Sequence, residues 1–170
     1  LKTTGSENNH IGLPLTLLRL TSSHDAAVVE LGTNHPGEIA YLAGIAQPTV
    51  AVITNVGPAH LEFFQSLDAV RREKLSLLDA VASEGRAIVP GDQLDVLLEA
   101  KAHLRPDTTL LTFGTSPQCG IQAVEVWRQE ERLSLRLRDV PGEFTIPLLG
   151  HHNVENALAA LACLQVLGMP

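Results

Sequence analysis

Two apolar runs in this chain are each followed by a side chain that can bind a metal ion. Glu30 stands near the end of the run 26–31, and His60 follows the run 50–55 after a Gly-Pro-Ala turn. Apolar runs rich in valine and isoleucine are typical of buried parallel strands. Open α/β sheets bind ligands beyond the carboxyl ends of such strands. We therefore expect Glu30 and His60 to belong to one shared site.

Each of these two side chains also has an ordinary interpretation. Glu30 could be a solvated carboxylate, although a charge beside valine and leucine is costly unless it is paired or bound to a metal. A single loop histidine such as His60 usually has no special role, but its place after a second strand favours a ligand. Because Mg²⁺ prefers oxygen ligands and an imidazole ligand to it is unusual, this pair alone does not name the metal.

Three further side chains could complete a nucleotide site. Lys74 lies on an amphipathic helix after His60, and its alternative interpretation is an ordinary solvated lysine. Asn153 and Asn156 lie one turn apart at the start of the last helix, so both amides could contact a planar donor–acceptor edge such as adenine. The alternative, which the sequence alone favours for Asn153, is a helix N-cap.

A polar cluster precedes the first predicted helix. Ser6, Asn8 and Asn9 carry hydroxyl and amide groups that suit a sugar or a peptide backbone, and that also suit an ordinary turn. The sequence contains neither G-x-x-x-x-G-K-[ST] nor G-x-G-x-x-G. A nucleoside triphosphate site would therefore be incomplete within these residues.

Strand and helix patterns that alternate along the chain must position these side chains. Apolar residues recur at helical spacing in five segments, which are 11–20, 36–46, 67–81, 93–104 and 153–167. Short apolar runs predict strands at 26–31, 50–55, 86–89 and 108–113. Strand–helix–strand alternation indicates a parallel sheet with helices on its faces.

The periodicity changes in the last third of the chain. Segments 121–127, 132–138 and 144–148 alternate apolar and polar residues, with turn residues between them, which predicts an antiparallel meander near 121–149. The predicted fold class is therefore α/β: a mostly parallel sheet flanked by helices, with a small antiparallel β meander, in one domain of residues 1–170.

Composition narrows the function further. The 170 residues carry a net charge of −7, which argues against a general nucleic-acid surface but leaves room for a nucleotide pocket. Cys119 and Cys163 form no C-x-x-C pair, so we expect reduced structural thiols in a cytosolic protein. No apolar run approaches the roughly 20 residues of a membrane span. Leu1 is not a natural start, so we expect a piece of a longer chain.

Four segments of this chain resemble the ordered motifs of the Mur ligases, a family of bacterial cell-wall enzymes. They are Thr4–Leu18, Val29–Ala40, Thr54–Glu62 and Gly150–Ala160. The four motifs stand in the family's order and the similarity covers nearly the whole chain. It is to the MurF type, UDP-N-acetylmuramoyl-tripeptide:D-alanyl-D-alanine ligases. The resemblance implies a P-loop-NTPase-like central ATP-binding domain, without its phosphate loop and without the N- and C-terminal domains.

The resemblance also implies roles for the residues singled out above. ATP and Mg²⁺ would be the cofactors. The implied metal ligands are Glu30, His60 and Lys74, the last as a carbamate that supplies oxygens, and His60 and Lys74 would also be catalytic. The implied nucleotide contacts are Asn34, His152, Asn153 and Asn156. The implied contacts to the muramoyl-peptide substrate are Ser6, Asn8 and Asn9.

The implied reaction is ATP-dependent amide formation in peptidoglycan synthesis. The carboxylate of UDP-MurNAc-tripeptide would attack the γ-phosphate, and the amine of D-Ala-D-Ala would then displace phosphate from the acyl phosphate. We expect the parent enzyme to be a cytoplasmic bacterial monomer that binds no nucleic acid. We expect these 170 residues alone to be inactive, because the loop that cradles the phosphates is not among them.

Two other interpretations remain open. The domain could belong to another Mur ligase or to a relative of folylpolyglutamate synthase, although Asn8–Gly12 and Gly37–Ile39 favour the MurF type. It could instead be a non-catalytic scaffold that keeps the fold. The presence of Glu30, His60 and Asn153 favours an enzyme over a scaffold.

Overall fold

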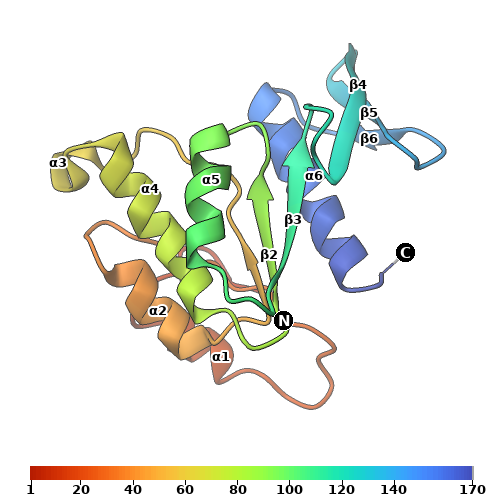
Figure 1. Ribbon diagram of the computed structural model, residues 1–170. Coiled ribbons are helices and arrows are strands. Elements are labelled where there is room, and N and C mark those ends of the chain that lie inside the picture. Colours follow the sequence, from red (N-terminus) through yellow and green to blue (C-terminus); the bar gives the residue numbers. More distant parts are fainter. Residues whose placement is uncertain (170) are drawn as a thin grey trace.

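The protein is built on one six-stranded sheet with strand order β1-β2-β3-β4-β5-β6, seen in a computed structural model that describes residues 1–169 (Figure 1). The strands are β1 (Val50–Val52), β2 (Arg86–Pro90), β3 (Thr109–Gly114), β4 (Ile121–Gln129), β5 (Arg132–Leu137) and β6 (Phe144–Ile146). Strands β1 to β3 are parallel, and β4 joins β3 in parallel over only two residue pairs. Strands β4, β5 and β6 are antiparallel. The predicted α/β fold with a terminal meander is confirmed.

Helices cover both faces of the parallel part of the sheet (Figure 1). The helical elements are α1 (Gly12–Leu17), α2 (Glu38–Ala46), α3 (Leu61–Phe64), α4 (Leu67–Leu75), the 3₁₀ turn η1 (Ser76–Ala80), α5 (Leu94–His103) and α6 (His151–Val166). Because side chains alternate across a strand, Ala87 and Val89 of β2 pack in the core under α4 and α5, whereas Ile88 packs in the second core under α6. Both cores are apolar, and together they fix the sheet between its helices.

The predicted strand at 26–31 is wrong. Val28 makes a single bridge with Lys2, and its side chain is 68% exposed. Within residues 1–169 the run makes ladder hydrogen bonds only with the first residues of the chain, through Leu1 and Thr3. A buried strand needs a hydrogen-bonded neighbour on the sheet and a packed face, and this run has neither. Its apolar composition alone was an insufficient signal.

Other predicted elements also end earlier than the sequence suggested: the helix predicted at 11–20 stops at Leu17, and the strand predicted at 144–148 stops at Ile146. The strand predicted at 50–55 stops at Val52, although Ile53 still donates to the Ile88 carbonyl. The helix predicted at 67–81 is α4 followed by η1, whose tighter turns carry the chain to Val81. Within residues 1–169, no helix is both long and apolar enough to span a lipid bilayer.

Candidate functional site

Glu30 lies on the extended segment that runs beside the chain start. Its Oε1 accepts a hydrogen bond of 2.9 Å from Asn8 Nδ2, and its backbone N–H donates to Thr3 Oγ1. A Cβ at Gly32 would lie 2.7 Å from the Asn8 side chain, so a larger residue there would displace the amide that bonds Glu30. Glu30 is exposed, and its other carboxylate oxygen makes no hydrogen bond with residues 1–169, so it can accept a ligand.

His60 lies in the turn between β1 and α3. It is the residue that precedes α3, with a left-handed backbone (φ 51°), and its carbonyl accepts from Phe63 and Phe64. The residue is exposed, and its imidazole makes no hydrogen bond with residues 1–169. Both ring nitrogens are therefore available to a ligand.

Lys74 lies on α4 and turns back towards the segment that leads to His60. Its Nζ donates a 2.9 Å hydrogen bond to the carbonyl of Asn55. Burial lowers the pKa of this ammonium group from its ordinary value. The contact brings α4 to the segment after β1, which leads to His60.

No hydrogen bond within residues 1–169 joins the three predicted metal ligands to one another. No group of three or more His, Cys, Asp or Glu side chains within residues 1–169 could hold a metal ion. Glu30 pairs with Asn8 and Lys74 with Asn55, and no hydrogen bond joins these two pairs. Each of the segments that carry Glu30 and Lys74 is thus fixed by its own hydrogen bond.

The predicted nucleotide contacts on the last helix lie together on α6. Asn153 Nδ2 donates to the Leu149 carbonyl at 2.8 Å, and Asn156 Nδ2 lies 3.5 Å from Asn153 Oδ1. Because α6 begins at His151 after Gly150, the alternative assignment of Asn153 as the N-cap is wrong. The exposed His152 ring packs over Gly150, where a Cβ would lie 2.6 Å from it. This start of α6 and the turn before α3 lie at the same end of the sheet (Figure 1).

The predicted substrate-binding residues form the turn before α1. Asn9 Oδ1 accepts the N–H groups of Ile11 and Gly12, at 3.0 and 2.9 Å. Asn9 therefore stabilises the first turn of α1, as the alternative interpretation held, while Asn8 faces Glu30. The carbonyl of the exposed Ser6 accepts from Asn8 N–H, and its hydroxyl makes no hydrogen bond within residues 1–169.

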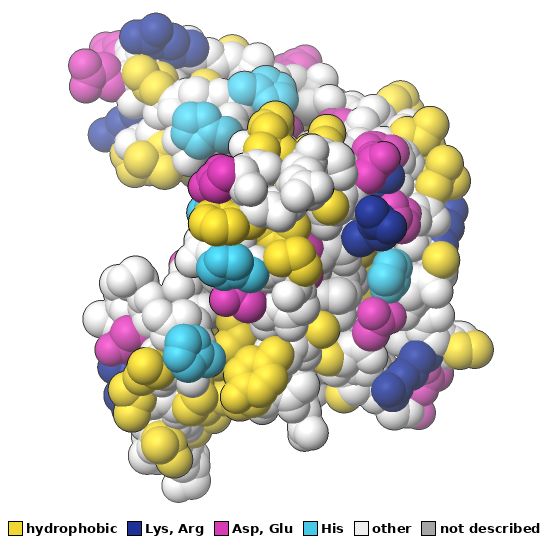
Figure 2. Space-filling model, turned by 90° about the vertical axis from the view of Figure 1, so that its left-hand side faces the viewer, with side chains coloured by type: hydrophobic (Ala, Val, Ile, Leu, Met, Phe, Trp, Pro, Cys, Tyr) yellow, Lys and Arg dark blue, Asp and Glu magenta, His cyan; other side chains and the backbone are white. Residues whose placement is uncertain are grey.

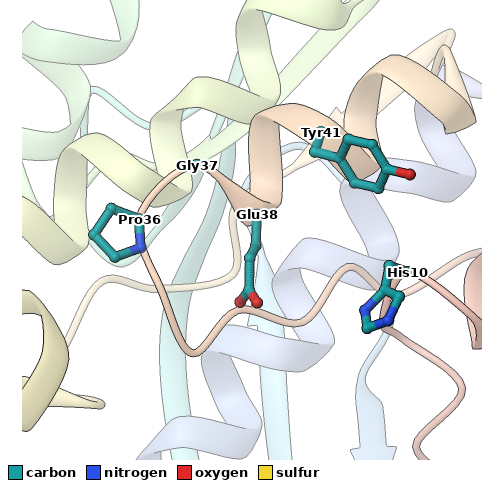
Figure 3. A pocket seen from close by; sticks show the side chains of 5 residues that line it. All are labelled: His10, Pro36, Gly37, Glu38 and Tyr41. Carbon is teal, nitrogen blue, oxygen red and sulfur yellow. The ribbon is translucent and has the colours of Figure 1, made fainter.

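Asn34 lies on the loop between Glu30 and α2, beside a wide and open hollow. Its backbone N–H donates to Glu38 Oε2 at 2.7 Å, and its side chain is exposed. The hollow has a volume of about 450 Å³ and is lined by His10, Pro36, Gly37, Glu38 and Tyr41 (Figure 3). Viewed from the side of α2 and α3, the molecule has a notched outline with several histidine and acidic side chains beside it (Figure 2).

Two residues at this site were missed by the sequence analysis. Glu73, next to Lys74, is 7% exposed and accepts hydrogen bonds from the backbone of Gly37 and Ile39. Gln93 accepts from Val56 N–H at 3.0 Å and donates to the Val56 carbonyl at 3.2 Å. Glu73 had a signal in the sequence, because it shares a helix face with Val70 and Leu77, where a charge is unexpected. Gln93 had none.

Asp92, just after β2, is a third side chain that fixes the backbone of a distant loop, as Glu73 and Gln93 do. Burial alone would raise the pKa of the Asp92 carboxyl, but hydrogen bonds from Ser116 and Thr115 outweigh burial and lower it to about 2. The oxygens of Asp92 accept the backbone N–H groups of Thr115 and Ser116 at 2.7 and 2.9 Å. The loop after β3 is therefore fixed by a carboxylate that is ionised at neutral pH.

The comparisons with known proteins point to one family. The family model described as the Mur ligase middle domain matches residues 1–164. The UDP-N-acetylmuramoyl-tripeptide--D-alanyl-D-alanine ligase of Bacillus subtilis (strain 168) is 37% identical over 161 residues, which are 95% of this chain and 34% of the relative. The chain therefore spans about a third of the length of this relative.

Two solved structures share the fold at substantial identity. A crystal structure of MurF from Acinetobacter baumannii matches with a TM-score of 0.86 and 36% identity, covering 99% of this chain and 37% of that chain. The MurF ligase from Thermotoga maritima in complex with ADP matches with a TM-score of 0.84 and 29% identity, covering 100% of this chain and 39% of that one.

Proposed function

The chain belongs to the Mur ligase family as a middle domain, and on that premise we propose that it is the ATP-binding part of a MurF-type ligase. The parent enzyme would add D-Ala-D-Ala to UDP-MurNAc-tripeptide in peptidoglycan synthesis. The observation that carries the proposal is the likeness of this whole chain to 39% of the Thermotoga maritima MurF ligase, which is described in complex with ADP.

We propose that the nucleotide lies at the end of the sheet where α6 begins. Asn153 and Asn156 carry their amides on one helix face there, with His152 beside them. Asn34 would contribute from the loop before α2, where its side chain is exposed. Planar amides on a fixed helix can donate to and accept from the edge of an adenine. The phosphate end would need a further segment, because residues 1–170 contain no phosphate loop.

Glu30, His60 and Lys74 would hold Mg²⁺ in this enzyme. The donor set fits a hydrated hard cation in part, since within residues 1–169 one carboxylate oxygen of Glu30 and the imidazole of His60 make no hydrogen bond. An ammonium group is not a metal ligand, so Lys74 fits only as a carbamate. When bound, the ion would neutralise charge that develops on the transferring phosphoryl group.

The substrate carboxylate would be presented from the side of Ser6, Asn8 and Asn9. Asn8 and Asn9 are held by Glu30 and by the first turn of α1, so their backbone is fixed before substrate arrives. The carboxylate attacks the γ-phosphate to give an acyl phosphate and ADP, and the amine of D-Ala-D-Ala then displaces phosphate. We propose that this takes place in the bacterial cytoplasm and that the enzyme is a monomer.

A full-length ligase that carries this chain as its middle domain would test the proposal. ADP release should require both UDP-MurNAc-tripeptide and D-Ala-D-Ala, and mass spectrometry should detect the extended pentapeptide product. Release that depends on a different amine or on a different carboxylate substrate would assign the chain to another ligase. An intact enzyme that binds ATP without turning over any of these substrates would support the scaffold interpretation instead.

A further inference from the structure

Glu73 is a buried carboxylate whose two oxygens are both occupied. It is 7% exposed, the most buried acidic residue within 1–169. Oε2 accepts from Gly37 N–H at 2.7 Å, and Oε1 accepts from Ile39 N–H at 2.8 Å. The Thr33 hydroxyl lies 3.3 Å from Oε1 and 2.9 Å from the His35 carbonyl, so its single proton serves one of them at a time. Burial of this charge is compensated only by those partners.

The groups that Glu73 holds all belong to the loop that enters α2. Gly37 precedes that helix and has a left-handed backbone (φ 90°), and Ile39 is its second residue. The free N–H groups at a helix start carry partial positive charge, which a carboxylate stabilises. The partner here comes from α4, far along the chain. Glu73 thus fixes the loop 33–39 against a different helix.

The same loop contacts the turn that carries His60. The rings of His35 and Phe63 lie 4.5 Å apart in a tilted arrangement. Phe63 belongs to α3, and its N–H donates to the carbonyl of His60. A shift of the loop 33–39 would therefore be transmitted to α3 and to the backbone of His60.

Glu73 and Lys74 bind the two loops from adjacent positions on α4. Glu73 holds the loop 33–39, while Lys74 Nζ donates to Asn55 in the segment after β1. One short helix thus determines how the loop after Glu30 lies relative to the turn before His60. The distance between the two loops depends on both contacts.

We propose that Glu73 is a positioning residue, which sets the loop that follows Glu30 at the right place relative to His60 and Lys74. The inference rests on the proposed function, in which these residues hold Mg²⁺. Both carboxylate oxygens of Glu73 are bound to the loop, so its proposed role needs no contact with the metal or ATP. Its effect on catalysis is exerted through the loop 33–39.

The test compares Glu73→Gln with wild type in a full-length ligase that carries this chain. The amide keeps one acceptor but turns an NH₂ towards one of the two backbone N–H groups, which therefore loses its partner. Asp107→Asn is the matched control. Asp107 also accepts from a hydroxyl and a backbone N–H, of Ser83 and Glu84, but it lies at the opposite end of the sheet.

We expect hydrogen–deuterium exchange in residues 33–39 to rise in Glu73→Gln and to stay unchanged in Asp107→Asn. The Mg²⁺ concentration for half-maximal ADP release should rise about tenfold, which is typical of lost support behind metal ligands, while the KM for the tripeptide substrate stays within about twofold. Thr33→Val, which loosens the same loop from its other side, should shift both readouts in the same direction by a smaller amount.

Unchanged exchange in 33–39 together with a wild-type Mg²⁺ requirement would overturn the inference. An equal shift in Asp107→Asn would overturn it too, because the effect would then be general destabilisation. If Glu73→Gln does not fold, Thr33→Val decides by the same two readouts. A wild-type enzyme without ligase activity would refute the proposed function alone, since the exchange measurement tests the loop contact without turnover.

Discussion

The parallel half of the sheet and the antiparallel meander are stabilised in different ways. Around β1, β2 and β3, polar side chains reach from one element to the backbone of a distant loop, as Glu73, Gln93 and Asp92 do. In the meander, two polar contacts join neighbouring strands, although Gln122 and Arg138 at its edge also reach carbonyls of the loop before β4. Ser134 pairs with Thr145 at 3.0 Å, and Arg136 binds Glu125 at 2.7 Å.

This difference follows from backbone hydrogen bonding. A meander satisfies its own N–H and C=O groups through the ladders between adjacent strands, whereas a loop beyond a parallel strand needs partners from elsewhere. In this chain those partners are side chains on α4 and after β2. We therefore expect substitutions in the meander to change stability, and substitutions in the loop contacts to change activity.

The largest stability effect should come from the meander core. Leu135 of β5 is fully buried against α6. Leu135→Ala should lower the free energy of unfolding by about 2–5 kcal/mol, because the lost side chain leaves a cavity. Urea unfolding of a full-length ligase that carries this chain would measure the loss, and the rate of ADP release below the unfolding transition should stay within about twofold of wild type.

A large fall in turnover by folded Leu135→Ala enzyme would contradict the expectation that the meander affects stability rather than activity. It would mean that the meander is coupled to the loops beyond β1 and β2. An exposed control in the same half of the sheet is Val126→Ala, since Val126 on β4 is 40% exposed and should cost far less stability.

The largest effect on activity should come from Glu30. Glu30→Gln removes a charge that we propose for Mg²⁺ while keeping an oxygen that can accept from Asn8. Turnover should fall by at least about 100-fold, the upper end of what losing a supporting partner of a metal ligand costs. Steady-state ADP release measures this, with thermal melting to show that folding is retained.

Glu125→Gln provides the control for Glu30. Glu125 is an exposed meander carboxylate paired with Arg136, and such surface pairs contribute about 0–1 kcal/mol. Its variant should retain wild-type turnover. A near-wild-type rate in Glu30→Gln would show that Glu30 is not part of the site. The carboxylate that we propose for Mg²⁺ would then have to be another residue.

Sequence periodicity predicted most of the sheet and the helices, because it depends on which face of each element is buried. The strands 86–90 and 109–114 and the long last helix were found in this way. The run 26–31 failed because burial of a strand depends on a neighbouring strand, which composition does not reveal. Val28 is apolar and yet mostly exposed.

The candidate site was predictable in its residue types and less so in its contacts. Asn153 and Asn156 do share a face of α6, as their spacing required. The roles of Glu73 and Gln93 depend on which distant loop each side chain reaches, and that is fixed only by tertiary packing. Glu73 also stands among Arg71, Arg72 and Lys74, so it resembles an ordinary surface charge until its helix face is considered.

A moderate effect should follow from loosening the segment that leads to His60. Gln93→Ala leaves the N–H and carbonyl of Val56 without their partners, each of which costs about 1–3 kcal/mol if it stays buried. We expect turnover to fall about tenfold, because small displacements of catalytic groups are costly. Gln122→Ala is the control, since Gln122 on β4 also bonds a loop carbonyl, that of Thr115. Equal losses of turnover in the two variants would contradict the expected difference between the parallel half of the sheet and the meander.

The smallest effect concerns Asp92 and its dependence on pH. Its pKa of about 2 lies below the ordinary value of 3.8, so ionised Asp92 stabilises the folded state. This contribution is fully present above about pH 4 and is lost as the pH falls through 2. We expect about 1 kcal/mol, less than the pKa difference implies, because Asp92 is an exposed residue and solvent screens its charge.

Urea unfolding from pH 2 to 7 should give a wild type that is more stable than Asp92→Asn by a constant amount above pH 4, with the difference shrinking below it. If the stability difference between wild type and Asp92→Asn still changes between pH 5 and 7, another group titrates with this loop. Ionised Asp92 alone would then not explain how the loop after β3 is fixed.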